Sequence, residues 1–216
     1  QYGFQPNKST IHPMVHLLNQ IGSAKKDKKV SIGIFMDISR AFDCISTPIM
    51  LKKLEKIGIK NRALEWFKNY LSGRRQCTII NDIKSGFLET KRGVPQGGII
   101  SPILFLIYIN DLPLATEMLT LLFADDSNFL IHGKSLEEII PKVNLEMKKI
   151  CDWFRLNELS IHPEKTKFMI FNKKESSIKW EDITINLDFN NEGNNDKNLI
   201  KKLGYILSLI HISEPT

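Results

Sequence analysis

Two adjacent carboxylates interrupt an apolar stretch in the middle of the chain. Asp125 and Asp126 lie between two runs of strand character within residues 121–130, which predicts a β-hairpin with the acidic pair at its turn. Neighbouring like charges repel each other and disfavour the compact state, whereas a bound divalent cation would reverse the sign of that cost. The motif alone is equally compatible with an ordinary Asp-rich turn.

A third carboxylate ends another apolar run. Residues 30–36 are rich in β-branched and apolar side chains, and Asp37 follows them directly. A buried strand that presents an Asp at its carboxyl end mounts a reactive group on a rigid element. Because Asp37 is far from Asp125 in the sequence, any meeting of these acids must be tertiary. Three hard oxygen ligands suit magnesium or manganese, and two such ions about 3.5–4 Å apart can activate a 3′-hydroxyl and stabilise a leaving phosphate oxygen.

Six segments of the chain resemble, in order, the motifs of reverse transcriptases of non-LTR (LINE-type, jockey-like) retrotransposons. The three central segments carry the acids and a Gly-rich loop: 37–43, 93–98 and 123–126. Three flanking segments match in the same order: 1–10, 157–167 and 202–205. The resemblance covers roughly residues 1–206, and six ordered motifs are far more specific than one.

The resemblance implies roles for the acids and for one aromatic residue. Asp37 and Asp125 would hold the ions most firmly, with Asp126 nearby, and we expect the three carboxyl groups to converge. Phe42 would pack against the sugar of the incoming nucleotide and exclude a 2′-hydroxyl. Plain core packing is the alternative for Phe42.

It also implies roles for three polar or flexible positions. Gln96 and Gly97 would lie near the incoming nucleotide and the template base, although an ordinary Gly-rich turn is the alternative. Lys165 would protonate or neutralise the pyrophosphate, or be a solvated surface lysine. We assign Asp43 a structural role, as a cap of the helix that follows it. For Arg74 and Arg75, contact with backbone phosphate and a solvated charge pair are equally compatible.

The order of expected elements indicates an α+β fold. It corresponds to a mostly antiparallel sheet with helices packed on one face. The resemblance implies a polymerase palm with part of the fingers. Expected helices cover 13–23, a segment from Ser46 to Gly58, 61–71, 101–111 and a long segment after Ser135; expected strands and hairpins cover 30–36, 75–91, 118–132, 167–171 and 199–206.

Composition places the chain among globular domains. Of 216 residues, 42% are hydrophobic and 25% charged, and the net charge of +6 fits a phosphate-backbone partner or, alternatively, a generally Lys-rich surface. Three cysteines without a C-x-x-C pair indicate neither disulfides nor zinc and favour a reducing, intracellular compartment. The resemblance to retrotransposon proteins implies the nucleus or the cytoplasm as that compartment. The longest apolar stretch, 99–109, is too short to span a bilayer, so we expect no membrane association.

The chain begins with Gln1 and not Met, so we expect a fragment. Residues 1–206 would form the reverse transcriptase domain, with the upstream fingers and the thumb missing. Residues 207–216 resemble a translated sequencing adapter and are interpreted as a non-native tail, with a native strand as the alternative. The expected partners are an RNA template, a DNA primer and dNTPs, with Mg²⁺ or Mn²⁺ as cofactor; the sequence does not indicate an oligomeric state.

Two other functions remain open at this point. The first is a truncated or domesticated remnant that binds nucleic acid without catalysis. The second is a reverse transcriptase of the group II intron maturase type. The run at 105–113 favours the LINE-type elements over the maturases. Because alignment of reactants supplies much of the rate in phosphoryl transfer, we expect residues 1–206 alone to polymerise poorly even with a complete acid triad.

Overall fold

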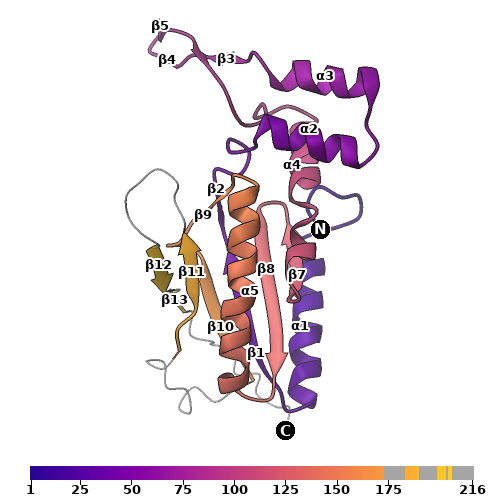
Figure 1. Cartoon of the computed structure of the whole chain (residues 1–216), viewed down its shortest axis with the longest axis vertical. Coiled ribbons are helices and arrows are strands. Elements are labelled where there is room, and N and C mark those ends of the chain that lie inside the picture. Colours follow the sequence, from indigo (N-terminus) through magenta and orange to yellow (C-terminus); the bar gives the residue numbers. More distant parts are fainter. Residues whose placement is uncertain (173–182, 190–198, 203, 206–216) are drawn as a thin grey trace.

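A central five-stranded sheet organises the molecule. The computed structural model describes residues 1–172, 183–189, 199–202 and 204–205. Its main sheet has the strand order β13-β10-β1-β8-β7 (Figure 1). All neighbouring pairs are antiparallel except β10 and β13, which run parallel. The strands are β1 (Val30–Met36), β7 (Leu119–Phe123), β8 (Asp126–Gly133), β10 (Lys167–Phe171) and β13 (Gly204–Tyr205).

Strand β1 lies at the centre of this sheet, between β8 and β10. Its residues pair in continuous register with β8, from Val30 opposite Gly133 to Met36 opposite Ser127. Six of its seven residues are buried, which explains why the segment is apolar almost throughout and does not alternate with polar residues. The rigid centre of the sheet therefore ends one residue before Asp37.

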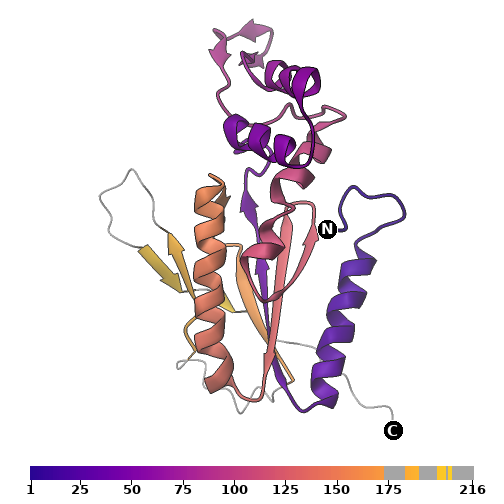
Figure 2. The same ribbon diagram turned by 45° about the vertical axis from the view of Figure 1, so that its right-hand side comes forward.

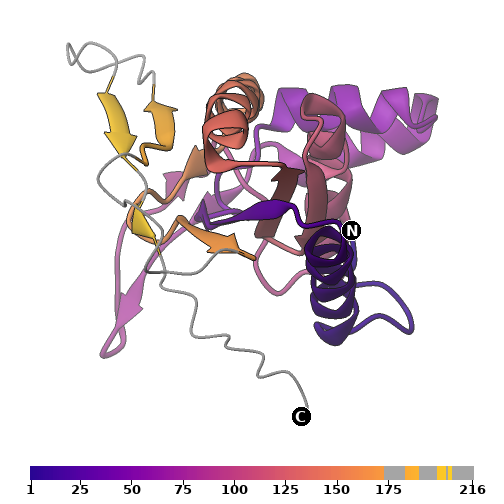
Figure 3. The same ribbon diagram turned by 90° about the horizontal axis from the view of Figure 1, so that it is seen from below.

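Helices cover both faces of the sheet. The main core includes Ile32 and Ile34 of β1 together with apolar residues of α5 (Leu136–Leu156) and α4 (Ser101–Ile109). On the opposite face, Ile21 and Leu17 of α1 (Ile11–Lys26) pack with Leu130, Phe171 and Phe35. Figure 3 shows α5 and α1 on opposite sides of the strands. The prediction that helices occupy one face only was wrong, because the second face of the strands also carries large apolar side chains.

A projecting lobe, residues 47–92, lies at one end of the sheet (Figure 2). It contains α2 (Thr47–Lys56), α3 (Asn61–Leu71) and a pair of two-stranded ladders that form an extended hairpin. The four short strands are β3 (Arg75–Gln76), β4 (Ile79–Ile80), β5 (Ile83–Lys84) and β6 (Leu88–Glu89). The predicted helix over 61–71 and the predicted hairpin over 75–91 are confirmed.

The remaining elements belong neither to the five-stranded sheet nor to the lobe. They are β2 (Ile38–Ser39), the 3₁₀-helix η1 (Leu112–Ala115), β9 (Ser160–Ile161), β11 (Asn186–Phe189) and β12 (Leu199–Lys202). Strand β2 pairs with β9, and β11 pairs with β12, in separate two-stranded sheets. The single strand predicted for 199–206 is instead two strands, β12 and β13, in different sheets. The predicted tail at 207–216 lies outside the described residues. No helix among the described residues is both long enough and apolar enough to cross a membrane.

Candidate active site

The acidic pair lies at the tip of the β7–β8 hairpin, as its sequence predicts. Phe123 pairs with Asp126, so Ala124 and Asp125 form a two-residue turn and Asp126 is the first residue of β8. Ala124 has φ +53°, the left-handed conformation that such tight hairpin turns require. This conformation is unfavourable for a residue with a Cβ and persists only when the surroundings support it.

The beginning of the chain supplies that support. Gln1 Oε1 accepts hydrogen bonds from the backbone N–H of Ala124 at 3.1 Å and of Gly3 at 2.8 Å. Tyr2 donates its backbone N–H to the carbonyl oxygen of Leu122 at 2.8 Å. A Cβ at Gly3 would lie 2.3 Å from the nitrogen of Ala124, so only glycine permits this close approach. Residues 1–3 therefore hold the turn that carries Asp125.

Asp37 lies at the same end of the sheet as the acidic pair. Met36 is opposite Ser127, so the ladder ends where Asp37 and Asp126 come next on the two strands. The backbone carbonyl of Asp37 accepts a hydrogen bond from the N–H of His162 at 2.9 Å. Burial raises the pKa of the Asp126 carboxyl, and the negative charges of Asp125 and Asp37 raise it further. The carboxylates of Asp37 and Asp125 thus repel that of Asp126.

These carboxylates supply the oxygen donors that hard divalent cations prefer. Among the described residues, however, no three His, Cys, Asp or Glu side chains are arranged closely enough to hold a metal ion. The structure therefore brings Asp37, Asp125 and Asp126 to one end of adjacent strands without closing them into a ligand set. The donor chemistry fits magnesium or manganese, and a cation would relieve the repulsion that adds to the effect of burial on the pKa of Asp126.

A cleft of about 540 Å³ opens beside the acids. Two of the three predicted metal ligands, Asp37 and Asp125, line it, whereas Asp126 and Gly97 are not among its lining residues. Its wall consists of Asp37, Ile38, Ser39, Arg40, Ala41, Phe42, Asp43, Gln96, Asp125, His162 and Lys165. The cleft thus brings together residues from four of the motifs that the sequence singles out.

Phe42 lies between the cleft and the core. Its ring centroid is 5.1 Å from that of Phe105 in α4, and its side chain is only partly buried. Its backbone carbonyl accepts a hydrogen bond from Val94 N–H at 2.9 Å, which ties it to the Gly-rich loop. Both expectations for Phe42 are therefore compatible with its position, because one side of the ring packs and the residue also lines the cleft.

Gln96 and Gly97 are exposed at the tip of the Gly-rich loop, and Gly97 has φ +80°. Gln96 Nε2 donates a hydrogen bond of 2.8 Å to Asp43 Oδ1. The prediction that Asp43 caps the next helix was wrong. The N-cap of α2 is Ser46, three residues later, and no side chain donates or accepts a capping hydrogen bond there.

Lys165 Nζ forms an ion pair of 3.2 Å with Asp37 Oδ2. Arg74 contacts the protein itself, since its Nη1 donates to the carbonyl oxygen of Gly93 at 2.8 Å. Arg75 is exposed on β3, with its guanidinium 5.8 Å from the ring centroid of Phe87. The two arginines, which the sequence could not distinguish, therefore have different surroundings.

His162 is a cleft residue that we did not assign from the sequence. It lines the cleft, and its Nδ1 is buried without a hydrogen-bond partner. The pairing of Ile38 with Ile161 in the β2–β9 ladder brings it beside Asp37. The available signal was its place in segment 157–167, three residues before Lys165, but a lone histidine without metal-ligand spacing gave no reason to choose it.

Comparison with known proteins identifies related sequences over most of the chain. Residues 1–207 match the family described as reverse transcriptase (RNA-dependent DNA polymerase). The chain is 25% identical over 185 residues to the RNA-directed DNA polymerase from mobile element jockey of Drosophila melanogaster, covering 82% of this chain and 20% of that protein. It matches the probable RNA-directed DNA polymerase from transposon BS of the same species with the same identity and coverage. The chain therefore spans about one fifth of the length of these curated relatives.

A solved structure gives the same fold. A telomerase from Candida albicans, in complex with a fragment of telomeric RNA, superposes with a TM-score of 0.52 at 15% sequence identity. The match covers 81% of this chain and 32% of that one. At this level of identity the likeness concerns the fold alone, and it confirms the expected α+β, palm-like architecture.

Proposed function

The chain belongs to the reverse transcriptase family, and from this premise we propose that it carries the nucleotidyl-transfer site of a non-LTR retrotransposon RNA-directed DNA polymerase. The observation that carries the proposal is the position of Asp37 and Asp125 on one cleft, at the ends of adjacent strands and within reach of the charge of Asp126. The sheet with its helices corresponds to a palm, and residues 47–92 correspond to part of the fingers.

The proposed substrates are an RNA template, a DNA primer and dNTPs. The relatives are named RNA-directed DNA polymerases, which supports RNA as template and dNTPs as substrate. Charge distribution supports a nucleic-acid partner: residues 47–92 carry 11 Lys and Arg against four Asp and Glu, whereas the whole chain carries 30 against 24. The remainder of the chain carries 19 Lys and Arg against 20 Asp and Glu, so the projecting lobe accounts for all of the net positive charge.

Asp37, Asp125 and Asp126 are the residues that would hold Mg²⁺ or Mn²⁺. When bound, such ions neutralise the charge that develops on the reacting phosphate and lower the pKa of the attacking hydroxyl. The protein contributes little covalent chemistry to phosphoryl transfer, so positioning of the substrates is its main task. Phe42, on the cleft wall, would leave no room for a 2′-hydroxyl, and Gln96 and Gly97 would contact the nucleotide and the template base.

Lys165 would serve the leaving group. Its ammonium is exposed, lines the cleft and lies within ion-pair distance of Asp37. A cation at this place can neutralise or protonate the pyrophosphate that departs when the new bond forms. An intracellular site of action, in nucleus or cytoplasm, is consistent with Cys44, Cys77 and Cys151, which form no disulfide among the described residues.

Extension of a labelled DNA primer on an RNA template tests the proposal, using the full-length protein that contains this chain. Asp125→Asn should abolish extension while leaving RNA binding intact. Asp82→Asn is a matched control, because Asp82 also occupies the second position of a two-residue hairpin turn, between Ile80 and Ile83, but far from the cleft. If the wild-type protein binds RNA and primer but does not extend the primer, it is instead a non-catalytic remnant.

A further inference from the structure

Asp43 and Gln96 are joined on the wall of the cleft by a side-chain hydrogen bond. Gln96 Nε2 donates to Asp43 Oδ1 at 2.8 Å, and both side chains line the cleft. The residues are 53 positions apart, and both are exposed. A polar contact between two exposed side chains adds little to stability, since water can replace either partner. Its location beside Phe42 and Asp37 suggests a different purpose.

The backbone on the Asp43 side of this contact is firmly held. Residues 40–44 form a tight turn in which Arg40 has φ +48° and its carbonyl accepts from the N–H groups of Asp43 at 2.9 Å and Cys44 at 3.1 Å. The carbonyl of Phe42 accepts from Val94, as described above. The Asp43 carboxylate therefore projects from a rigid segment that also carries Phe42.

The Gly-rich loop is pressed against this turn at its start. Gly93 has φ +83°, and a Cβ there would lie 2.8 Å from Asp43 Cα. Gly93 N–H donates to the carbonyl of Ile45 at 2.7 Å, and Arg74 holds the Gly93 carbonyl. Glycine is required at this position because the backbones of 42–43 and 93 touch.

The end of the loop is fixed as well. Ser101, the first residue of α4, donates its hydroxyl to the carbonyl of Pro95 at 2.5 Å and its N–H to the carbonyl of Gly98 at 3.2 Å. The backbone on both sides of Gln96 is therefore constrained, but the side-chain torsion angles of Gln96 are not. The hydrogen bond to Asp43 fixes these torsion angles.

The chemistry of the pair also determines that the amide nitrogen of Gln96, and not its oxygen, faces Asp43. An ionised carboxylate only accepts hydrogen bonds, so it can hold the amide nitrogen of Gln96 but not the amide oxygen. Among the described residues, the Gln96 side chain makes no other hydrogen bond. Its Oε1 acceptor and its second N–H therefore remain available to a ligand in the cleft, in an orientation that Asp43 determines.

We propose that Asp43 is a positioning residue, which orients the Gln96 amide toward the incoming nucleotide and so contributes to nucleotide affinity. The proposal rests on the function proposed above, since it assumes that a nucleotide occupies this cleft. Asp43 acts through Gln96 and does not itself need to touch the nucleotide. Its effect should therefore depend on the presence of Gln96.

Steady-state primer extension with the full-length protein tests this dependence. Asp43→Ala should raise the KM for dNTP by about 3- to 10-fold, the range expected for removal of one hydrogen bond, with a smaller change in kcat. Gln96→Ala should raise KM at least as much, and the double variant should be no worse than Gln96→Ala alone. Asp43→Asn, which keeps an acceptor oxygen but no charge, should remain close to the wild type. Effects of Asp43→Ala and Gln96→Ala that simply multiply, or an Asp43→Asn variant as impaired as Asp43→Ala, would overturn the proposal.

A second measurement is independent of catalysis. In ¹⁵N-labelled protein, the side-chain amide signal of Gln96 is assigned by its disappearance in Gln96→Ala. Its proton shift should change in Asp43→Ala and be largely restored in Asp43→Asn. If the wild type does not extend primers but the amide signal responds as expected, the proposed function fails while the contact stands. An amide signal that does not respond to Asp43→Ala refutes the positioning role whatever the activity.

Discussion

The ammonium of Lys165 lies 3.2 Å from Oδ2 of Asp37, which joins the segment after the acidic hairpin to the end of the central strand. The lysine side chain is 64% exposed and that of Asp37 28% exposed. An ion pair with this exposure contributes only about 0–1 kcal/mol to folding, because water screens both charges. Its interest is therefore functional, since it places a cation beside the acid that the reaction is proposed to use.

Lys165→Ala should lower the rate of nucleotide incorporation by about 10²-fold, the lower end of the range for a group that transfers a proton. The melting temperature should hardly change, because the exposed ion pair stabilises the fold so little. Single-turnover kinetics and thermal melting measure the two effects. Lys165→Arg distinguishes the two proposed roles: arginine keeps the charge but does not give up its proton, so it should restore activity only if neutralisation is enough. A rate equal to that of the wild type in Lys165→Ala would remove Lys165 from the site.

Repulsion among the acids leads to a prediction that needs no enzymatic activity. Because burial, and in addition the charges of Asp125 and Asp37, raise the pKa of Asp126, its ionised form destabilises the fold at neutral pH. Asp126→Asn should therefore raise the melting temperature in a chelator. Adding Mg²⁺ should raise the melting temperature of the wild type more than that of the variant, since the cation relieves the same repulsion.

Asp82→Asn, at the matched hairpin turn, is the control for this experiment. Because its three cleft carboxylates are intact, it should melt at the wild-type temperature in a chelator and should be stabilised by Mg²⁺ as much as the wild type. A wild type whose melting temperature is insensitive to Mg²⁺, together with an Asp126→Asn variant no more stable than wild type, would contradict a cation site at these carboxylates.

Local sequence patterns predict most of the elements that position the site. The apolar run 30–36 is β1, and the acidic hairpin forms with Asp125 at its turn, because periodicity and turn chemistry act over a few residues. Local patterns could not predict that α1 covers the second face of the sheet. The packing of α1 against Leu130 and Phe171 depends on contacts between segments more than 100 residues apart.

The same limit applies to the side chains of the cleft. The sequence motifs select Asp37, Phe42 and Gln96, but the partner of Gln96 is decided by how two loops meet. Asp is a residue type that often caps helices, so the sequence favours that role for Asp43. Its contact with Gln96 depends on the tertiary fold. His162 likewise carries no local signal and reaches the cleft through the β2–β9 pairing.

Phe42→Ala should relax the selection against ribonucleotides. Removing the ring from the cleft wall would open space for a 2′-hydroxyl, so the ratio of kcat/KM for an rNTP to that for the matching dNTP should rise by at least about 10-fold. Competitive incorporation on one template measures this ratio. Phe42→Tyr, which keeps the ring, is the matched variant and should retain selection. Unchanged selection in Phe42→Ala would leave the ring with packing against Phe105 as its role.

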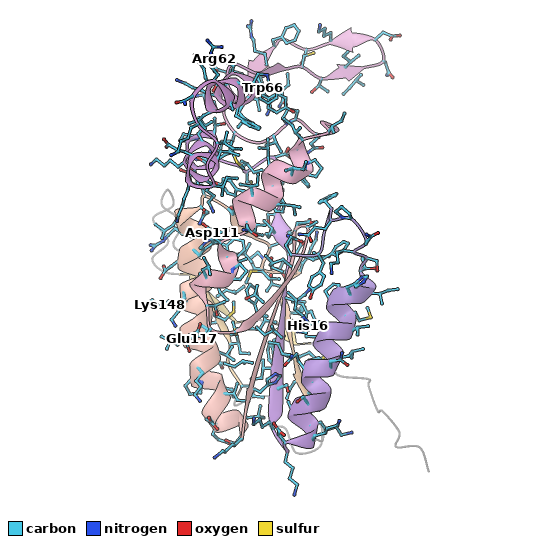
Figure 4. The ribbon with its side chains drawn as sticks, turned by 90° about the vertical axis from the view of Figure 1, so that its right-hand side faces the viewer. His16, Arg62, Trp66, Asp111, Glu117 and Lys148 are labelled. Carbon is cyan, nitrogen blue, oxygen red and sulfur yellow. The ribbon has the colours of Figure 1, made fainter. Side chains whose placement is uncertain are left out.

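The basic lobe should contribute to nucleic-acid affinity in a salt-dependent way. Arg75 and Lys84 flank the exposed ring of Phe87, with Lys84 Nζ 4.4 Å from its centroid. Replacing both cations with Gln should weaken RNA binding. It should also make the dependence of log K on the logarithm of the salt concentration shallower, by about 0.7 for each phosphate that the protein no longer neutralises. Lys148→Gln is the control, because Lys148 lies on α5, away from the lobe that carries Arg62 and Trp66 (Figure 4). Equal effects at Lys148 and in the lobe would indicate non-specific attraction to the whole surface.

The buried Tyr108 hydroxyl links two segments that adjoin the cleft, and its contribution to folding stability can be measured through its titration. It donates to the carbonyl of Asn157 at 2.6 Å and accepts from the N–H of Ser46 at 3.3 Å. It thus connects α4 to the start of α2 and to the segment that leads to Lys165. Tyr108→Phe should destabilise the fold by about 1–3 kcal/mol, since both buried backbone groups lose their partner.

Burial raises the pKa of Tyr108 from 10.0 to about 12. The folded state therefore holds this proton more tightly than the unfolded state. The resulting stability is fully present below about pH 10 and is lost as pH rises through about 12. Urea unfolding between pH 8 and 12 should show a steeper alkaline loss of stability in the wild type than in Tyr108→Phe, so that the two curves converge at high pH.

Tyr70→Phe is the control, because among the described residues the Tyr70 hydroxyl makes no hydrogen bond, and that variant should parallel the wild type. Parallel curves for the wild type and Tyr108→Phe would mean that this hydroxyl is not the buried link between the helices and the catalytic segments.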